Sequence, residues 1–295
     1  MLWDWLICAD NIRIYIYLLA VDKLYIAITF NGGNLTVEKE YLNFFQEIDE
    51  IDQSFLAKVF EEHTYTDTDG TVLPYRLYVP FDYNPNKKYP VLLALHGAGE
   101  RGNDNLANLK YLLPQMFGVS DSPVRDSITV VPQCPEGNQW VDWPWSNGSY
   151  STEFVKISNE LKTVMNIMRT VTKEFSTDSN RYYVVGLSMG GYGTWDLLVR
   201  FPKYFAAGVP ICGGGAPNAA KKIVDMPIWA FHGNADDIVP VSGTRNMVDA
   251  LKKAGSTSVK YEEIDGGDHN IWGEIFTRKE LADWLFSQNL SKRQK

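Results

Sequence analysis

Cysteine is scarce in this sequence, and its number is odd. The 295 residues include only Cys8, Cys134 and Cys212, none of which forms a C-x-x-C pair. This pattern favours neither a disulfide framework nor a zinc site, and reduced thiols in a cytoplasm are the simplest interpretation. We therefore expect no metal and no other cofactor.

Positive charge is also in deficit. Lysine and arginine number 28 against 36 aspartates and glutamates, which gives a net charge of −8. The basic residues are scattered, apart from a short tail at 292–295, and they form no basic stripe of the kind that binds nucleic acids. No nucleic-acid partner is expected.

Long hydrophobic runs are missing as well. Within the first thirty residues, the longest uncharged run is 14–21, whereas a membrane span needs about 20 apolar residues. A secretory signal would require a basic segment before the apolar stretch and a small-residue cleavage site after it, and neither is clear. The protein is predicted to be cytoplasmic and not bound to a membrane, with secretion left open.

The sequence divides at about residue 60. Residues 1–60 are predicted to form an N-terminal extension, with a strand or hairpin around residues 12–17 and a helix that begins at Thr36. Three interpretations of residues 1–30 stay open: an extra packed strand, an association surface that makes a homo-oligomer, or a misassigned translation start. Residues 61–295 are long enough for one large α/β domain.

Within this domain, apolar strands alternate with helical stretches. Residues 64–66 and 73–79 read as antiparallel edge strands, and the continuous apolar run 89–95 is typical of a strand buried on both faces of a parallel sheet. Further strands are expected at 127–132, 181–187, 206–211, 227–231 and 258–264, with helices at 106–116, 153–175, 190–200, 242–254 and 276–288. This alternation predicts an α/β fold with a mostly parallel central sheet and helices on both faces. The links are too short for a large lid domain.

One strand ends in a motif that carries chemistry. Gly186-Leu187-Ser188-Met189-Gly190 matches G-x-S-x-G, in which a sharp strand-to-helix turn raises the serine hydroxyl above the sheet. The flanking glycines allow the close backbone approach that such a turn needs. Ser188 is therefore a candidate nucleophile, although the pentapeptide alone also fits an ordinary turn.

A serine nucleophile needs a base, and the base needs an acid. Of the four histidines, His269 lies in a glycine-bearing loop between the last strand and the last helix, so it is the base by elimination and by position. His96 and His232 sit in His-Gly pairs at strand ends, where an imidazole can brace a loop. Asp236 and Asp237 are adjacent candidates for the acid, and the spacing alone does not choose between them.

Four segments together carry a family resemblance. They are Leu95-His96-Gly97-Ala98-Gly99-Glu100, Gly186 to Gly191, His232 to Pro240 (HGNADDIVP), and Gly267-Asp268-His269. From about residue 65 to residue 290, the chain resembles the α/β-hydrolase superfamily, and most closely its dienelactone-hydrolase-like and phospholipase/carboxylesterase-like serine esterases. The first sixty residues have no part in this resemblance.

The resemblance implies roles for individual residues. In similar esterases the acid is the fourth residue after the histidine of H-G-x-x-D-x-x-V-P, which is Asp236 here, so the implied catalytic triad is Ser188, Asp236 and His269. The oxyanion hole would use the amide of Met189, which follows the nucleophile, and that of Ala98, which follows His-Gly. Gly97 and Gly99 would let that backbone approach closely.

Other residues are candidates for substrate binding. Trp140, Trp143 and Trp145 follow a parallel strand, where they would face the crevice at the carboxyl ends of the sheet. Packing in the core is the alternative for these rings. Gly99 is a further candidate for substrate binding, and residues 213–218 either border the acyl pocket or form a turn.

The expected function is a serine carboxylesterase that acts through an acyl-enzyme. Its substrates would be small-molecule or polysaccharide-linked esters, with short acyl, aromatic or sugar-linked groups such as feruloyl or acetyl esters. A serine peptidase of the prolyl-oligopeptidase type and a non-catalytic binding protein on the same scaffold are the alternatives. The filled triad positions weigh against the binding protein.

Overall fold

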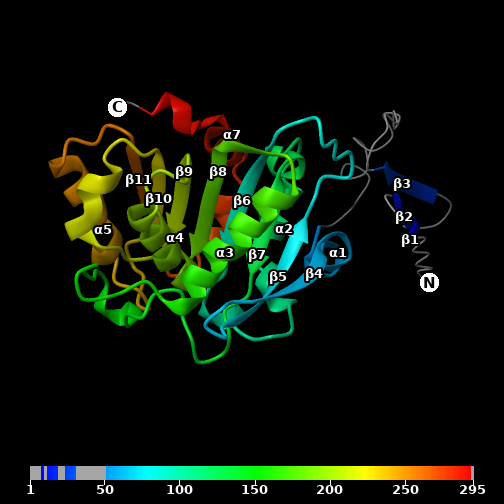
Figure 1. The fold of residues 1–295 in the computed structure, drawn as a ribbon. Coiled ribbons are helices and arrows are strands. Elements are labelled where there is room, and N and C mark those ends of the chain that lie inside the picture. Colours follow the sequence, from blue (N-terminus) through cyan, green and yellow to red (C-terminus); the bar gives the residue numbers. More distant parts are fainter. Residues whose placement is uncertain (1–7, 10–11, 19–23, 31–50, 294–295) are drawn as a thin grey trace.

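A central eight-stranded sheet organises the protein. The computed structural model describes residues 8–9, 12–18, 24–30 and 51–293, and within them the large sheet has the order β11-β10-β9-β8-β6-β7-β5-β4 (Figure 1). Its strands are β4 Glu61–Thr66, β5 Val72–Tyr78, β6 Tyr89–Leu95, β7 Ile128–Pro132, β8 Thr177–Leu187, β9 Ala207–Ile211, β10 Ile228–Gly233 and β11 Val259–Ile264.

The sheet is mostly parallel. Strands β7, β6, β8, β9, β10 and β11 pair in parallel, whereas β4 and β5 form an antiparallel hairpin that adds to β7. Parallel strands need crossover connections, and the helices between them supply these. The predicted α/β fold with a mostly parallel central sheet and two antiparallel strands at one edge is confirmed.

Helices cover both faces of this sheet. They are α1 Gln53–Val59, α2 Leu113–Gly118, α3 Asn159–Glu174, α4 Met189–Arg200, α5 Ser242–Lys253, α6 Trp272–Phe276 and α7 Lys279–Ser287. Buried residues of α3, α4 and α5 belong to one hydrophobic cluster, and those of α1, α2, α6 and α7 belong to another. Successive side chains of β6 enter alternate clusters, Val91 and Leu93 one, Leu92 and Ala94 the other. The fully apolar β6 is therefore buried on both faces, as its sequence predicts.

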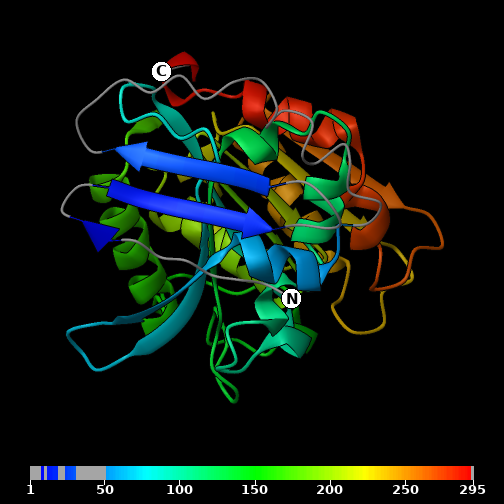
Figure 2. The ribbon, with the colours of Figure 1, turned by 90° about the vertical axis from the view of Figure 1, so that its right-hand side faces the viewer.

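The N-terminal strands make a sheet of their own. β1 Cys8–Ala9, β2 Ile12–Leu18 and β3 Leu24–Phe30 pair antiparallel in the order β1-β2-β3, and Figure 2 shows β2 and β3 running in opposite directions. The helix expected from Thr36 falls on residues 31–50, which lie outside the described residues. The division of the chain at residue 60 stays a prediction, and β4 begins at Glu61.

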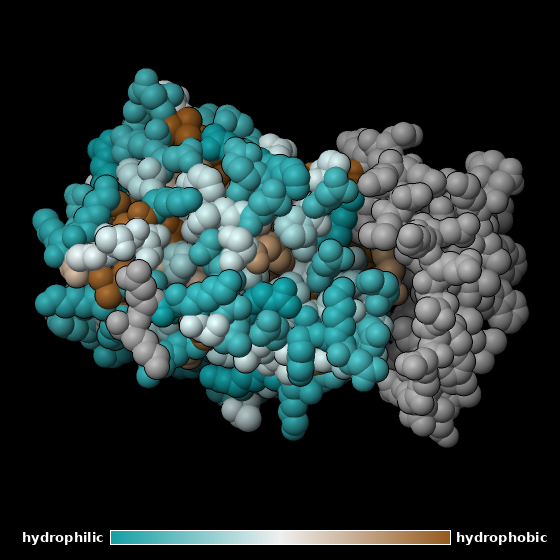
Figure 3. All heavy atoms as spheres, turned by 90° about the horizontal axis from the view of Figure 1, so that it is seen from above, coloured by the Kyte–Doolittle hydropathy of each residue, from teal (hydrophilic) through white to brown (hydrophobic). Residues whose placement is uncertain are grey.

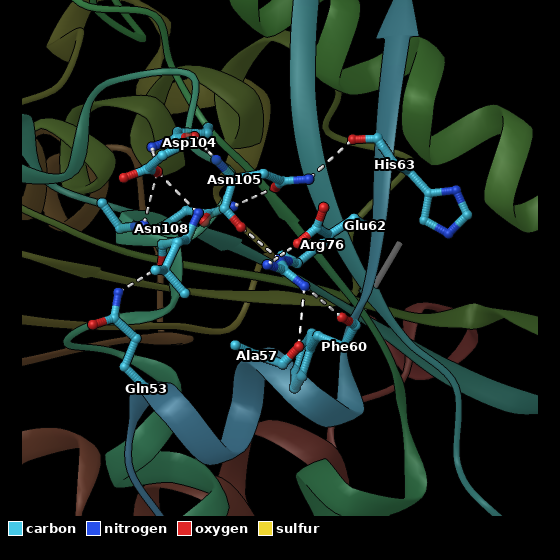
Figure 4. Close-up of polar contacts among 12 residues, drawn as sticks. Gln53, Ala57, Phe60, Glu62, His63, Arg76, Asp104, Asn105 and Asn108 are labelled. Carbon is cyan, nitrogen blue, oxygen red and sulfur yellow. Dashed lines mark hydrogen bonds and ion pairs between the residues drawn. The ribbon is translucent and has the colours of Figure 1, made fainter. Parts of the chain in front are cut away.

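A buried arginine connects α1 to the edge of the large sheet (Figure 4). Arg76 of β5 donates from Nη1 to the carbonyl oxygens of Ala57 and Phe60, at the C-terminal end of α1, and from Nη2 to the carboxylate of Glu62. Its Nε donates to the carbonyl oxygen of Asn105 at 2.5 Å. Carbonyls in the last turn of a helix have no partner within the helix, so Arg76 satisfies groups that would otherwise be buried unpaired.

One face of the molecule is mostly hydrophilic. In the view from above, the described residues are mostly hydrophilic, with hydrophobic residues in small scattered groups (Figure 3). Among the described residues, no helix has both the length and the apolar character that a membrane crossing requires.

Candidate active site

The turn after β8 has the geometry that the G-x-S-x-G pattern predicts. Ser188 adopts φ 54° and ψ −119°, a backbone conformation that costs a non-glycine residue roughly 1–3 kcal/mol. The surrounding glycines are required by space. A Cβ on Gly186 would lie 2.2 Å from the carbonyl oxygen of Gly190, and one on Gly190 would lie 2.0 Å from that of Leu95. The strained turn therefore presents the serine side chain at the start of α4.

Three loops at the carboxyl ends of the parallel strands bring the predicted triad together. Nε2 of His269, from the loop after β11, lies 2.8 Å from Oγ of Ser188. Nδ1 of the same ring lies 2.7 Å from Oδ2 of Asp236, which follows β10. The Asp236 side chain is completely buried and that of His269 is 11% exposed. Both distances are those of hydrogen bonds, so the imidazole connects the serine to the carboxylate.

The structure chooses between the two adjacent carboxylates. Asp236 faces His269, and its Oδ1 accepts the backbone amides of Ile238 and Val239 at 2.9 and 2.8 Å, whereas Asp237 is exposed. Burial alone would raise the pKa of the Asp236 carboxyl, but hydrogen bonds from His232, His269 and Val239 outweigh burial and hold the pKa below its usual range. Asp236 is therefore ionised at neutral pH and can stabilise a protonated His269.

One cluster in this region also has metal-like spacing. Potential ligand atoms of Cys212, His232 and Asp236 all lie within 4.8 Å of one another. The carboxylate already accepts hydrogen bonds from two histidines, and burial raises the pKa of the Cys212 thiol well above its usual value. His232 and Asp236 of this cluster thus take part in the hydrogen-bond network of the triad.

Two helix N-termini supply candidate oxyanion donors. Met189 is the first residue of α4, and Ala98 is the first residue of a 3-10 turn, Ala98–Glu100, that follows β6. The first amides of a helix have no acceptor within it, so both N–H groups are available to a ligand. A Cβ on Gly97 would lie 3.5 Å from that of Ser188 and 2.7 Å from Cδ1 of Leu187. The predicted close approach is thus seen at Gly97. At Gly99 it is not seen, because a Cβ there would meet nothing within 4 Å.

His96 fixes the peptide group that carries the Ala98 amide. Its Nε2 accepts the backbone N–H of Cys134 at 2.9 Å, so the proton of the neutral ring is on Nδ1, which donates to the carbonyl oxygen of Gly97 at 2.6 Å. Burial lowers the pKa of His96 to about 4, which keeps the ring neutral. In a trans peptide the carbonyl and the following N–H point in opposite directions. Holding the Gly97 carbonyl therefore aims the Ala98 N–H away from His96.

The sequence pattern missed Glu100. Its buried side chain accepts the N–H of Gly97 at 2.9 Å, and its carbonyl oxygen accepts from Gln133, whose Oε1 in turn accepts the N–H of Asn105. Burial raises the pKa of this carboxyl. A glutamate three residues after a helix-capping position was the available signal, because this spacing returns the side chain to the capping residue. The carbonyl oxygen of Asn105 in turn accepts from Arg76. Hydrogen bonds therefore connect Glu100 to the contacts of Arg76 that Figure 4 shows.

The prediction for one of the three tryptophans, Trp140, needs a correction. Trp140 is fully buried, packs against Gly193 of α4 and donates from its indole to the carbonyl oxygen of His96, so it is a core residue and does not face a substrate. Trp143 and Trp145 are half-buried against the same core, and their substrate role stays a prediction. Trp272, which the sequence did not single out, has its ring at right angles to His269 with 5.2 Å between centroids.

Comparison with known proteins shows the family to which the sequence is similar. A family model described as phospholipase/carboxylesterase matches residues 83–280, which include all three triad residues. In the crystal structure of a thermostable esterase, 36% of aligned residues are identical. The TM-score is 0.71, over 79% of this chain and 64% of the other.

Curated relatives are more distant. A bifunctional acetylxylan esterase/xylanase of Neocallimastix patriciarum is 26% identical over 175 residues, covering 59% of this chain and 23% of its own length. A carboxylesterase of Arabidopsis thaliana is 25% identical and covers 66% of this chain and 88% of its own length. A probable dipeptidyl-aminopeptidase B of Ajellomyces capsulatus is 24% identical, and the match covers 79% of this chain and 27% of its own length. The chain spans about a quarter of the length of the first curated relatives it matches.

Proposed function

The chain belongs to the phospholipase/carboxylesterase family, and from this membership we propose that it is a serine esterase that hydrolyses carboxylic esters through an acyl-enzyme. The observation that carries the proposal is the continuous hydrogen-bonded path from Oγ of Ser188 through His269 to Asp236. A serine hydroxyl becomes a useful nucleophile when a base removes its proton, and this path supplies the base and its counter-charge.

In the proposed first step, Oγ of Ser188 attacks the ester carbonyl while Nε2 of His269 takes its proton. Negative charge moves to the carbonyl oxygen, where the N–H groups of Ala98 and Met189 stabilise it. His269 then returns the proton to the departing alcohol, and Ser188 holds the acyl group as an ester. Asp236 stays ionised and stabilises the imidazolium.

In the second step, water takes the place of the alcohol. His269 removes a proton from the water, the hydroxide attacks the acyl carbonyl, and the same two amides stabilise the second oxyanion. Collapse of this intermediate returns the proton to Ser188 and releases the carboxylic acid. The same residues therefore serve both steps, with no other reactant than water.

The replacement Ser188→Ala tests the proposal. We expect hydrolysis of a short-chain nitrophenyl ester to fall to the background rate, and labelling by a fluorophosphonate probe to disappear. Ser120→Ala, which alters an exposed serine away from the triad, is the matched control and should leave both readouts unchanged. Retention of ester hydrolysis above background by Ser188→Ala would contradict the proposal.

The substrate is proposed to be a small-molecule or polysaccharide-linked ester. Support comes from the similarity to the Neocallimastix bifunctional acetylxylan esterase/xylanase and from the half-buried rings of Trp143 and Trp145, which follow a parallel strand of the sheet. A panel of acetylated xylan, feruloyl esters and nitrophenyl esters of increasing chain length tests this class. A strong preference for long acyl chains over both sugar and feruloyl esters would contradict it.

Peptidase activity is the second candidate function, since the Ajellomyces relative is described as a dipeptidyl-aminopeptidase. Paired ester and anilide substrates with the same acyl group separate the two. We expect the ester to react and the anilide to remain intact.

We propose a cytoplasmic location on the support of two buried free thiols, Cys134 and Cys212, and fractionation of the source cells tests it.

A further inference from the structure

A second histidine contacts the carboxylate of the triad. His232 is the fifth residue of β10, its side chain is completely buried, and the proposed reaction does not use it. Its Nε2 lies 3.1 Å from Oδ2 of Asp236, the same oxygen that Nδ1 of His269 contacts at 2.7 Å. One carboxylate oxygen is thus enclosed between two imidazoles.

The contacts of the ring fix the position of a proton. Nε2 of His232 faces two acceptors, Oδ2 of Asp236 and the carbonyl oxygen of Val239 at 3.0 Å, so this nitrogen carries a hydrogen and donates it. On the other side of the ring, Nδ1 lies 2.8 Å from the hydroxyl of Thr244, which is 2.7 Å from the carbonyl oxygen of Gly213. These contacts hold the ring in one orientation.

We propose that His232 is a positioning residue that limits the basicity of Asp236 and thereby sets the pH range in which His269 accepts the serine proton. The inference rests on the proposed esterase function. Asp236 accepts two amides at Oδ1 and two imidazoles at Oδ2, and its side chain also interacts with the Cys212 thiol, so its charge is shared among several donors. Each donor reduces the charge that the carboxylate offers to His269.

The direction of the effect follows from this sharing. Without the donor on His232, more of the carboxylate charge is available to His269, and the imidazolium form of His269 is stabilised. Protonated His269 cannot accept the serine proton. If His269 becomes protonated at a higher pH than before, the enzyme therefore loses activity at that higher pH as the solution is made more acidic. The acidic limb of the pH profile for kcat/KM therefore moves upward when the donor is removed.

Other titratable groups face this cluster from neighbouring elements. They are Cys212 after β9, Tyr192 of α4, Glu263 of β11 and Asp268 of the loop before α6. Burial raises the pKa of Cys212 and of Tyr192, and hydrogen bonds from Arg245 chiefly lower that of Glu263, so these three keep one charge state around neutrality. All four are unchanged in the variants below, so they contribute equally to both profiles.

The test compares His232→Leu, which removes the donor at similar volume, with His232→Gln, whose side-chain amide can place an N–H where Nε2 lies. For His232→Leu we expect the acidic limb to rise by about one pH unit, so that kcat/KM measured on this limb falls roughly tenfold while KM stays nearly unchanged. His232→Gln should restore the limb to its original position. His63→Gln, a histidine of β4 outside the site, is the control and should shift nothing.

A double-variant cycle separates positioning from a general structural role. If His232 acts through Asp236, its replacement should have no further effect on kcat/KM in an Asp236→Asn background. Additive losses, or an acidic limb of His232→Leu at the wild-type pH, would overturn the inference. If circular dichroism shows that His232→Leu does not fold, His232→Asn takes its place in both experiments. The shorter side-chain amide of this variant does not reach Asp236.

The outcome is distinguishable from a failure of the proposed function. If the unaltered protein lacks Ser188-dependent ester hydrolysis, the esterase proposal itself fails. If that hydrolysis is present and the His232 variants show neither the limb shift nor the non-additivity, only the positioning role fails.

Discussion

The indole N–H of Trp140 donates to the carbonyl oxygen of His96 at 3.0 Å, and the two rings lie edge to face with 5.2 Å between centroids. His96 in turn holds the Gly97 carbonyl. A tryptophan from the loop after β7 therefore supports the peptide group that carries a proposed oxyanion donor. Its role is in the packing beneath the site.

This relationship predicts different outcomes for two tryptophan replacements. Trp140→Phe removes a buried donor and leaves the His96 carbonyl without this partner, so we expect a loss of about 2 kcal/mol in the free energy of unfolding, with the ranking of acyl substrates unchanged. Trp145→Phe, at a half-buried ring, should change stability less and alter KM for aromatic esters. Urea denaturation and an ester panel measure the two effects, and a changed acyl preference in Trp140→Phe would contradict the assignment of this ring to the core.

The backbone strain at Ser188 predicts a difference between two inactive variants. Ser188→Gly removes the side chain that makes φ 54° unfavourable, whereas Ser188→Ala keeps a Cβ in the same conformation. We expect Ser188→Gly to be about 1 kcal/mol more stable than Ser188→Ala, with esterase activity absent in both. Thermal unfolding of the pair provides the measurement, and equal melting temperatures would mean that the turn stores no strain.

His96 predicts a dependence of stability on pH. Its pKa is about 4 in the folded protein and about 6.5 when exposed, so between these values the unfolded chain binds more protons than the folded one. The neutral ring makes its full contribution to the free energy of unfolding above pH 6.5. This contribution declines as the pH falls toward 4, by about 3 kcal/mol in all. In His96→Gln this part of the decline should be missing, which unfolding titrations at pH 7 and 4.5 would reveal as a smaller difference between the two.

The sequence predicts the sheet and the nucleophile because both depend on local patterns. A strand that is apolar throughout, such as β6, must be buried on both faces. The G-x-S-x-G pattern alone also fits an ordinary turn, but the apolar strand before it and the helical stretch after it favour a nucleophile. Element boundaries are less accurate where a cap decides them. The helix expected at 153–175 begins only at Asn159, because the Ser158 hydroxyl accepts the N–H of Leu161 and stops the preceding chain from joining it.

The rest of the site depends on contacts between distant segments. Positions 236 and 237 are both aspartates, and only the fold turns Asp236 toward His269. The family resemblance indicated Asp236, whereas the spacing of the sequence could not distinguish the two. Trp140 follows a parallel strand, as a substrate-binding ring could, but the position of Gly193 in α4 makes room for it in the core. The contacts of Glu100 and of His232 with their partners likewise become visible only when the loops meet.

Arg76 predicts the largest loss of stability among the replacements away from the triad. Its side chain is 5% exposed and donates to the carbonyl oxygens of Ala57, Phe60 and Asn105 (Figure 4). In Arg76→Met these carbonyls lose their partner while an apolar chain fills much of the space, so we expect the free energy of unfolding to fall by about 3 kcal/mol.

The control for this prediction is Glu62→Gln, which alters the remaining partner of Arg76. The Glu62 side chain is 67% exposed, and an ion pair with one exposed member contributes little, so this variant should lose no more than about 1 kcal/mol. Hydrogen bonds connect Asn105 to Gln133 and Gln133 to Glu100. Because of this connection, Arg76→Met should also lower kcat while leaving fluorophosphonate labelling intact. Equal losses of stability in the two variants would show that the Arg76 network owes its stability to the ion pair, and the backbone carbonyls would then contribute little.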